Sequence, residues 1–160
     1  MTRFRKETIR LLTQYEGRRA QPYKDTEGNW TVGIGHDLDA NPLKYSKAVT
    51  IPEIVPVREY RLSNAEMDAL LLEDIARAEI DYKRLGLPTW NHPTSREILI
   101  RMIFQMGLEG VRGFHKMLKA LSMGHYRWAG LEMLDSEWAR TETPVRAAEE
   151  ARRMMDLDAE

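Results

Sequence analysis

The segment from Ser63 to Gly86 constrains the fold most strongly, because it predicts a single long helix. Ser63 and Glu66 fit a capping box, in which the serine oxygen and the glutamate carboxylate each satisfy a free backbone amide. Apolar residues then keep one face of the helix until Gly86 and Pro88 end the pattern. A helix of ~22 residues is roughly 33 Å long, which is enough to join two lobes of a small protein.

A small antiparallel sheet is predicted on the N-terminal side of this helix. We expect short strands at Tyr23–Lys24, Trp30–Val32 and about His36–Leu38. Residues 25–29 supply the first turn and residues 33–35 the second, because both are rich in glycine and polar turn-forming residues. This sheet is the only β-structure that the sequence predicts.

Helices account for most of the remaining chain. Residues 3–15 show apolar side chains at helical spacing, and Gly17 is a suitable helix stop. A second capping box, Thr94 to Glu97, precedes the apolar run 98–106, which predicts a buried helix. Prolines interrupt residues 39–61, where we assign no element. Shorter helices are expected at 114–121, at 126–134, at 136–141 and from Pro144 onward. The predicted fold is therefore mainly α, in an α+β arrangement with one small sheet.

Composition excludes several classes of protein. The 24 Lys and Arg residues nearly balance the 25 Asp and Glu residues, which argues against a dedicated nucleic-acid-binding protein. No cysteine is present, so disulfides and thiolate metal sites are excluded. The four histidines are scattered without metal-ligand spacing, and we expect neither a metal nor a cofactor. We expect a soluble chain without membrane insertion or an export signal of its own, because no window approaches the ~20 apolar residues that span a bilayer.

Two carboxylates and a hydroxyl in the N-terminal region are the candidate reactive groups. Glu16 falls at the end of the first helix, where the helix dipole disfavours a charged carboxylate and favours the neutral acid that a general acid must be. Asp25 opens the first turn, and Thr31 lies on the following strand. Hydrolysis of a glycosidic bond needs one carboxylic acid and one carboxylate on opposite sides of the sugar. The three residues therefore describe a possible glycosidase site.

Each of these residues also has a simpler structural explanation. A lone glutamate such as Glu16 is usually solvated surface, Asp25 is suited to bonding its own turn, and threonine is common in strands. A dinucleotide fingerprint starting at Gly33 and Gly35 is excluded, because Leu38 stands where the third glycine belongs. Spacing alone leaves the choice between a catalytic and a structural role open.

Three separate blocks of sequence resemble one known family. They are PYKDTEGNWTVGIGH with Glu16 and Gly17 upstream, ILIRMIFQMGLEGVRGF, and the segment that contains Ser136, Trp138, Thr143, Pro144 and Arg146. All three resemble the T-even phage lysozymes, the endolysins of glycoside hydrolase family 24. Residues 8–36 and 62–150 align with that family, whereas the proline-rich middle and the short C-terminus do not.

The resemblance implies a two-lobed lysozyme-like fold with a cleft between its lobes. It implies a single domain over residues 1–160, with a β-containing lobe at 14–62, a connecting helix at 63–86, and a helical lobe at 87–160 plus 1–13. The implied activity is that of a muramidase, which cleaves the β-1,4 bond between N-acetylmuramic acid and N-acetylglucosamine in peptidoglycan with inversion. Lysis of a bacterial host by a phage is the implied biological role.

The same resemblance assigns roles to individual residues. Glu16 matches the general acid, and Asp25 matches the carboxylate that acts with Thr31 on the attacking water. Further matches are substrate-binding residues and a structural ion pair between the sheet and the long helix. The substrate-binding matches are Gly35, Phe104, Gln105 and Arg146, the last of which also approaches the catalytic glutamate. The structural pair is His36 with Asp74.

The chain also departs from the family pattern. Met117, Glu132 and Glu137 occupy positions where the family has neutral or basic groove residues, and the near-neutral charge weakens long-range attraction to the cell wall. Two alternatives stay open: a lytic transglycosylase, and an inactive wall-binding or virion structural module on the same fold. We expect a monomer with peptidoglycan as its partner, located in the host bacterial cytoplasm until holin-dependent release, with a virion-associated form as the other possibility.

Overall fold

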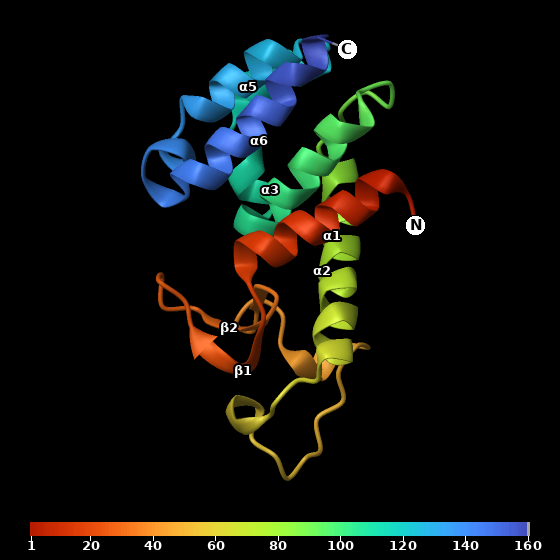
Figure 1. The fold of residues 1–160 in the computed structure, drawn as a ribbon, viewed down its shortest axis with the longest axis vertical. Helices are drawn as coiled ribbons and strands as arrows, with labels where there is room; N and C mark the ends of the chain where they lie inside the picture. Colours follow the sequence, from red (N-terminus) through yellow and green to blue (C-terminus); the bar gives the residue numbers. More distant parts are fainter. Residues whose placement is uncertain (160) are drawn as a thin grey trace. The chain divides into compact units, whose positions relative to one another are not determined.

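A computed structural model describes residues 1–159 of the chain. These residues form two compact units. The sheet unit comprises residues 9–77, and the helical unit comprises residues 1–8 together with residues 78–159. Both boundaries fall inside helices, one in α1 (Arg3–Glu16) and one in α2 (Asn64–Arg84). Figure 1 shows the helices and strands of both units, coloured along the sequence. The predicted fold class is confirmed: mainly helical, with one small antiparallel sheet.

The sheet unit contains three short strands in sequence order, β1 (Arg19–Lys24), β2 (Trp30–Gly33) and β3 (His36–Asp37). Both pairings are antiparallel, and a register shift interrupts the β1–β2 ladder between Arg19 and Tyr23. All three predicted strands are present; β1 begins four residues earlier than predicted, β2 ends one residue later and β3 one residue earlier. Residues 39–61 form two short 3-10 turns, η1 (Leu43–Tyr45) and η2 (Val57–Glu59).

An apolar cluster holds the sheet unit together. It joins β2 to the proline-rich segment and to the first turns of α2 through buried side chains. These are Val32, Leu43, Val49, Leu62, Met67 and Leu70. The predicted capping box of α2 is present, because Ser63 Oγ accepts from the Glu66 N–H (3.1 Å) and Glu66 Oε1 accepts from the Ser63 N–H (2.9 Å). The start of the long helix is therefore fixed by its own sequence.

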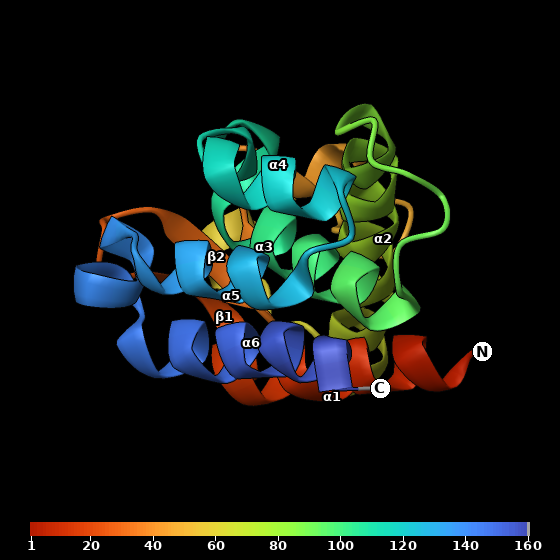
Figure 2. The same cartoon turned by 90° about the horizontal axis from the view of Figure 1, so that it is seen from above.

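The helical unit contains α3 (Pro93–Arg112), α4 (His115–Ser122), α5 (Tyr126–Leu134), a five-residue π-type turn η3 (Trp138–Glu142) and α6 (Pro144–Asp156). A final turn, η4, spans Leu157–Ala159. Figures 1 and 2 show α5 and α6 lying side by side. Pro144 occupies the first turn of α6 as predicted, since this position needs no amide donor.

The predicted start of α3 is wrong. Thr94 does not cap the helix; instead His92 is the N-cap, and its Nδ1 accepts from the Thr94 N–H at 3.1 Å. Pro93 takes the first helical position, where its fixed φ is already compatible with the helix. The capping-box pattern failed here because the proline just before it had already started the helix.

A buried charged network crosses the core of the helical unit, where the sequence predicted only an apolar helix. Arg101 on α3 is 4% exposed and donates two hydrogen bonds to Glu150 of α6, at 2.7 and 2.8 Å. Arg101 also donates to Thr8 Oγ1 at 2.9 Å, and the Thr8 hydroxyl donates to Glu97 at 2.6 Å. Each charged group is thus hydrogen-bonded, as burial requires. The network ties the start of α1 to α3 and α6.

We predict that Arg101→Met lowers the free energy of unfolding by about 3–5 kcal/mol, because it removes two short hydrogen bonds from the buried Glu150 carboxylate. The double variant Arg101→Met/Glu150→Met removes both charges and should recover most of that loss. Urea unfolding followed by circular dichroism measures both variants. A single variant as stable as the wild type would contradict this account of the network.

Candidate active site

Glu16 is the last residue of α1, and its side chain lies against the backbone of Gly35. Gly17 ends the helix with a left-handed φ of 70°, and its N–H donates to the Thr13 carbonyl at 2.9 Å. A Cβ added at Gly35 would lie 2.7 Å from Cγ and 2.8 Å from Oε2 of Glu16. Gly35 also has a φ of 68°, so both space and backbone geometry require glycine there. The β2–β3 turn therefore confines the Glu16 carboxylate.

Asp25 fulfils the structural role that its turn predicts. Its Oδ1 accepts the backbone N–H groups of Glu27 and Asn29, each at 2.9 Å. Both of these bonds use the same carboxylate oxygen. Within residues 1–159 the other oxygen, Oδ2, accepts no hydrogen bond, so it is free to accept one from a water molecule. A structural role for Asp25 is thus compatible with a chemical one.

Thr31 is joined to Asp25 through the backbone of a single residue, Asn29. The N–H of Asn29 donates to Asp25 Oδ1, and the carbonyl of Asn29 accepts from the Thr31 hydroxyl at 3.3 Å. Thr31 is only 6% exposed, and its hydroxyl uses its proton on Asn29, which leaves its lone pairs available as acceptors. The hairpin thereby holds the carboxylate and the hydroxyl in a fixed relation.

Tyr23, which the sequence did not single out, lies close to the candidate reactive groups. It pairs with Thr31 across the β1–β2 ladder, and Arg19 stacks over its ring with Cζ 4.4 Å from the centroid. The pKa of the Tyr23 phenol is raised, chiefly by burial; Arg19 opposes the shift, while Glu16 and Asp25 add to it. Glu16 and Asp25 therefore act electrostatically on the same phenol. The hairpin register, which places Tyr23 opposite Thr31, was the signal available in the sequence.

His36 and Asp74 form a pair within the sheet unit. His36 is 2% exposed; its Nδ1 lies 2.8 Å from Asp74 Oδ2, and its Nε2 lies 2.8 Å from the Asn41 carbonyl oxygen. Both ring nitrogens thus face acceptors, which suits the doubly protonated ring. Asp74 also pairs with Arg77 one turn further along α2. The pair joins β3 to the long helix.

The other residues implied by the resemblance belong to the helical unit. Gln105 on α3 is fixed at both ends of its amide, since Trp138 Nε1 donates to its Oε1 at 3.0 Å and its Nε2 donates to Thr143 Oγ1 at 3.1 Å. Phe104 and Arg146 are half-buried, on α3 and α6 respectively. Trp138 and Thr143 orient Gln105, a function that the sequence analysis did not assign to them.

One expectation about the departures from the family pattern needs correction. Met117 is fully buried in α4, so it is a core residue and not a groove residue. Trp128 on α5 is half-buried, and its indole N–H donates to Glu132 at 3.1 Å. Glu137 is exposed.

No metal-ion cluster of three or more His, Cys, Asp or Glu side chains occurs in the part of the chain that the structure describes. Across residues 1–159 no helix is both long and apolar enough to cross a membrane.

The candidate reactive groups of the sheet unit are thus a carboxyl group at the end of α1, a carboxylate in the β1–β2 turn and a hydroxyl on β2. The phage lysozyme family model matches residues 13–155. The chain belongs to this family and is a lysozyme-like glycosidase, a class that hydrolyses peptidoglycan.

Several relatives share much of the sequence. The probable T4-type lysozyme 2 of Dictyostelium discoideum is 32% identical over 149 residues, which cover 86% of each chain. The probable T4-type lysozyme 1 of the same organism is 28% identical over 148 residues, again covering 86% of each chain. The pre-baseplate central spike protein Gp5 of Enterobacteria phage T4 is 30% identical over 139 residues, which cover 80% of this chain and 24% of that protein.

We predict that His36 titrates above its ordinary pKa of 6.5. Burial, the largest single influence, lowers the pKa, but the hydrogen bond and charge of Asp74 and the Asn41 carbonyl together outweigh burial and the charge of Arg77. A raised folded-state pKa means that protonation stabilises the fold. This contribution is complete below the ordinary pKa and is lost as pH rises through the folded value. NMR titration of the His36 ring measures the shift.

Stability measurements give an independent check on this titration. His36→Gln should lower stability most at acidic pH and progressively less as the pH rises. His115→Gln, on an exposed position of α4, is the matched control and should change stability by less than about 0.5 kcal/mol. A His36 pKa at its ordinary value would remove the proposed contribution.

Proposed function

We propose that this protein is an inverting muramidase that cleaves the β-1,4 bond between N-acetylmuramic acid and N-acetylglucosamine in peptidoglycan. The observation that carries the proposal is the Asn29 backbone, which holds the carboxylate of Asp25 and the hydroxyl of Thr31 together. Confinement of Glu16 by Gly35 adds the second carboxyl group that such hydrolysis needs. Both features lie within the sheet unit.

In this mechanism Glu16 is the general acid and Asp25 the general base. Glu16 donates its proton to the glycosidic oxygen as the bond from the anomeric carbon to that oxygen breaks. The free Oδ2 of Asp25 and the lone pairs of Thr31 hold a water molecule, and Asp25 takes its proton as the water oxygen bonds the anomeric carbon. Attack from the face opposite the leaving group inverts the configuration. We propose that Gly35, Phe104, Gln105 and Arg146 bind the sugar chain.

We predict that Glu16→Gln lowers the rate of peptidoglycan hydrolysis by roughly 10²- to 10⁴-fold, because glutamine cannot donate a proton to the leaving oxygen. Release of reducing ends from purified sacculi gives the rate. Glu53→Gln, an exposed carboxylate in the same unit, is the control and should hydrolyse at the wild-type rate. Wild-type activity in Glu16→Gln would remove the catalytic assignment.

The same digestion distinguishes the alternatives. Mass spectrometry should find reducing-end muramic acid, whereas dominant 1,6-anhydro products would identify a lytic transglycosylase. Proton NMR at early times should show the α-anomer first, since inversion of a β-linkage produces it. An absence of any product from the wild type would favour an inactive wall-binding or virion module.

We further propose that the enzyme acts in lysis of a phage host and reaches the wall through a holin. Bacteria that express the chain should then lyse only when a holin is co-expressed, as turbidity would record. The similarity to Gp5, named as a spike protein of the phage baseplate, favours a virion-associated form as the second candidate. Lysis without a holin would contradict the proposed route.

A further inference from the structure

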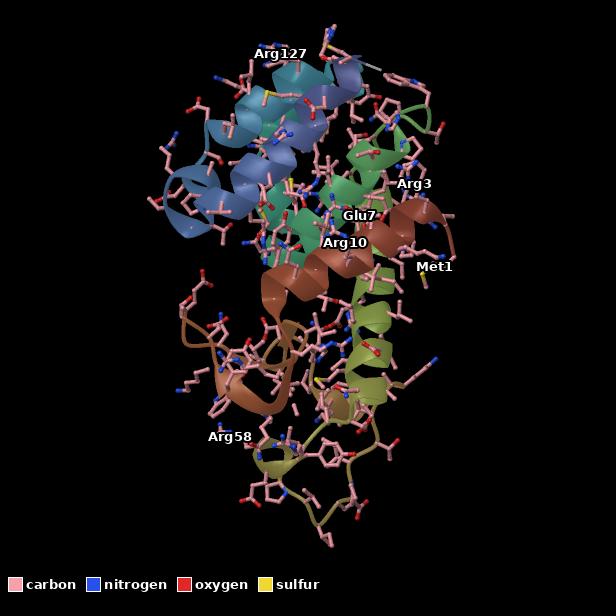
Figure 3. All side chains as sticks on the ribbon, viewed as in Figure 1. Met1, Arg3, Glu7, Arg10, Arg58 and Arg127 are labelled. Atoms are coloured by element: carbon pink, nitrogen blue, oxygen red, sulfur yellow. The ribbon has the colours of Figure 1, made fainter. Side chains whose placement is uncertain are left out.

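A cluster of two cations and one indole lies on the sheet, and we call it the cationic indole patch: Lys24, Trp30 and Arg58. The Lys24 Nζ lies 5.6 Å and the Arg58 Cζ 4.3 Å from the ring centroid of Trp30. Lys24 on β1 is directly opposite Trp30 on β2, and Arg58 reaches the ring from η2 (Figure 3 labels Arg58). Three separate segments thus contribute to one surface.

This surface is distinct from the candidate active site. Trp30 and Thr31 are adjacent on β2, so their side chains point to opposite faces of the sheet. Lys24 and Trp30, which are paired, share one face, whereas Tyr23 and Thr31, also paired, share the other. The patch therefore uses the face of the hairpin that the proposed chemistry leaves unused.

The patch offers hydrogen-bond donors with no ion partners. Among residues 1–159, neither Lys24 nor Arg58 forms a salt bridge with a carboxylate, and both side chains are exposed. The indole N–H of Trp30 likewise donates to no group in this part of the chain and is not buried. The neighbouring carboxylate of Asp39 accepts the backbone N–H of Trp30 at 3.0 Å.

The stacking of Arg58 on Trp30 prepares it to bind an anion. Stacking occupies only the face of the guanidinium, so its N–H donors remain available in the plane for a carboxylate. An arginine held against a ring also has less conformational freedom to lose on binding. An ammonium, a guanidinium fork and an indole N–H together match an anionic ligand with several oxygen acceptors.

We propose that the cationic indole patch binds the carboxylates of the stem peptides of peptidoglycan, as an accessory wall-binding site. This inference rests on the proposed function, which makes peptidoglycan the substrate. With a formal net charge of −1 the chain has no general attraction for an anionic wall, so attraction must come from local cations such as these. Stem peptides carry free carboxylates at intervals along each glycan strand, which suits repeated binding.

The test measures binding and hydrolysis separately. Binding is followed by pelleting with insoluble sacculi in the Glu16→Gln background, where the polymer stays intact. Lys24→Gln/Arg58→Gln should weaken binding to native sacculi by roughly 2- to 30-fold, the range expected for two exposed ion pairs. Sacculi whose carboxylates have been amidated should bind the Glu16→Gln parent and its Lys24→Gln/Arg58→Gln derivative equally and weakly.

Two controls distinguish a loss of binding at the patch from the effect of a changed net charge and from misfolding of the variant. Lys83→Gln/Arg127→Gln removes two exposed cations of the helical unit, changes the net charge equally, and should bind native sacculi like its parent. Arg58→Gln alone, on an exposed 3-10 turn, should fold normally and show part of the loss. Thermal unfolding shows whether each variant is folded.

Several outcomes would overturn the inference. Unchanged binding of the folded Lys24→Gln/Arg58→Gln variant would make the patch a stabilising cation–π cluster and nothing more. An equal loss of binding in the Lys83→Gln/Arg127→Gln control would attribute the effect to net charge alone. If Lys24→Gln/Arg58→Gln weakened binding to amidated sacculi as much as to native sacculi, recognition of carboxylates would be excluded. Patch-dependent binding to anionic phospholipid vesicles, without binding to sacculi, would show that the ligand of the patch is a lipid surface and not the cell wall. Wild-type enzyme that binds through the patch but releases no reducing ends would reject the proposed function and leave the binding site intact.

Discussion

The buried contact between His36 and Asp74 is the constraint on which the sheet unit depends. It attaches β3 to the long helix α2, and Gly35, the residue before His36, is thereby held at one place. Because Gly35 lies against the side chain of Glu16, the contact also determines where that carboxyl group can be. His36 thus influences the position of the Glu16 carboxyl group through one intervening residue, Gly35. The apolar cluster around Val32 supports the same strands from within the unit.

Local signals in the sequence predicted the elements that depend only on neighbouring residues. The Ser63 capping box, the Gly17 stop and the hairpin turns are each specified within a few positions, and each is present. Features that depend on distant residues were not predictable in this way. The burial of Arg101, for example, depends on Glu150, which is 49 positions away. The start of α3 was instead mispredicted from local sequence, because His92 and Pro93 directly precede the Thr94 pattern and already begin the helix.

The candidate site shows the same difference between features set by neighbouring residues and features set by distant ones. A turn role and a catalytic role for Asp25 were competing interpretations of the sequence, yet the geometry accommodates both, because one oxygen serves the turn and the other is free. Tyr23 gains its importance from its partner across the ladder, which spacing along one strand does not reveal. Gln105 was assigned only by resemblance, and the two side chains that orient it come from residues 138 and 143. Physical reasoning from sequence therefore found the candidate reactive groups more readily than the side chains that position them.

The division of the chain into units has a consequence for its synthesis on the ribosome. The sheet unit is one continuous stretch, residues 9–77, and its apolar cluster is complete once α2 begins to emerge. The helical unit is discontinuous, since it combines residues 1–8 with residues 78–159. The buried network of Thr8 is therefore complete only after Glu97, Arg101 and finally Glu150 have been synthesised. Domains fold as units during translation, with N-terminal parts first. The first two turns of α1 are thus made before the rest of the helical unit and are among the last residues of that unit to reach their final partners.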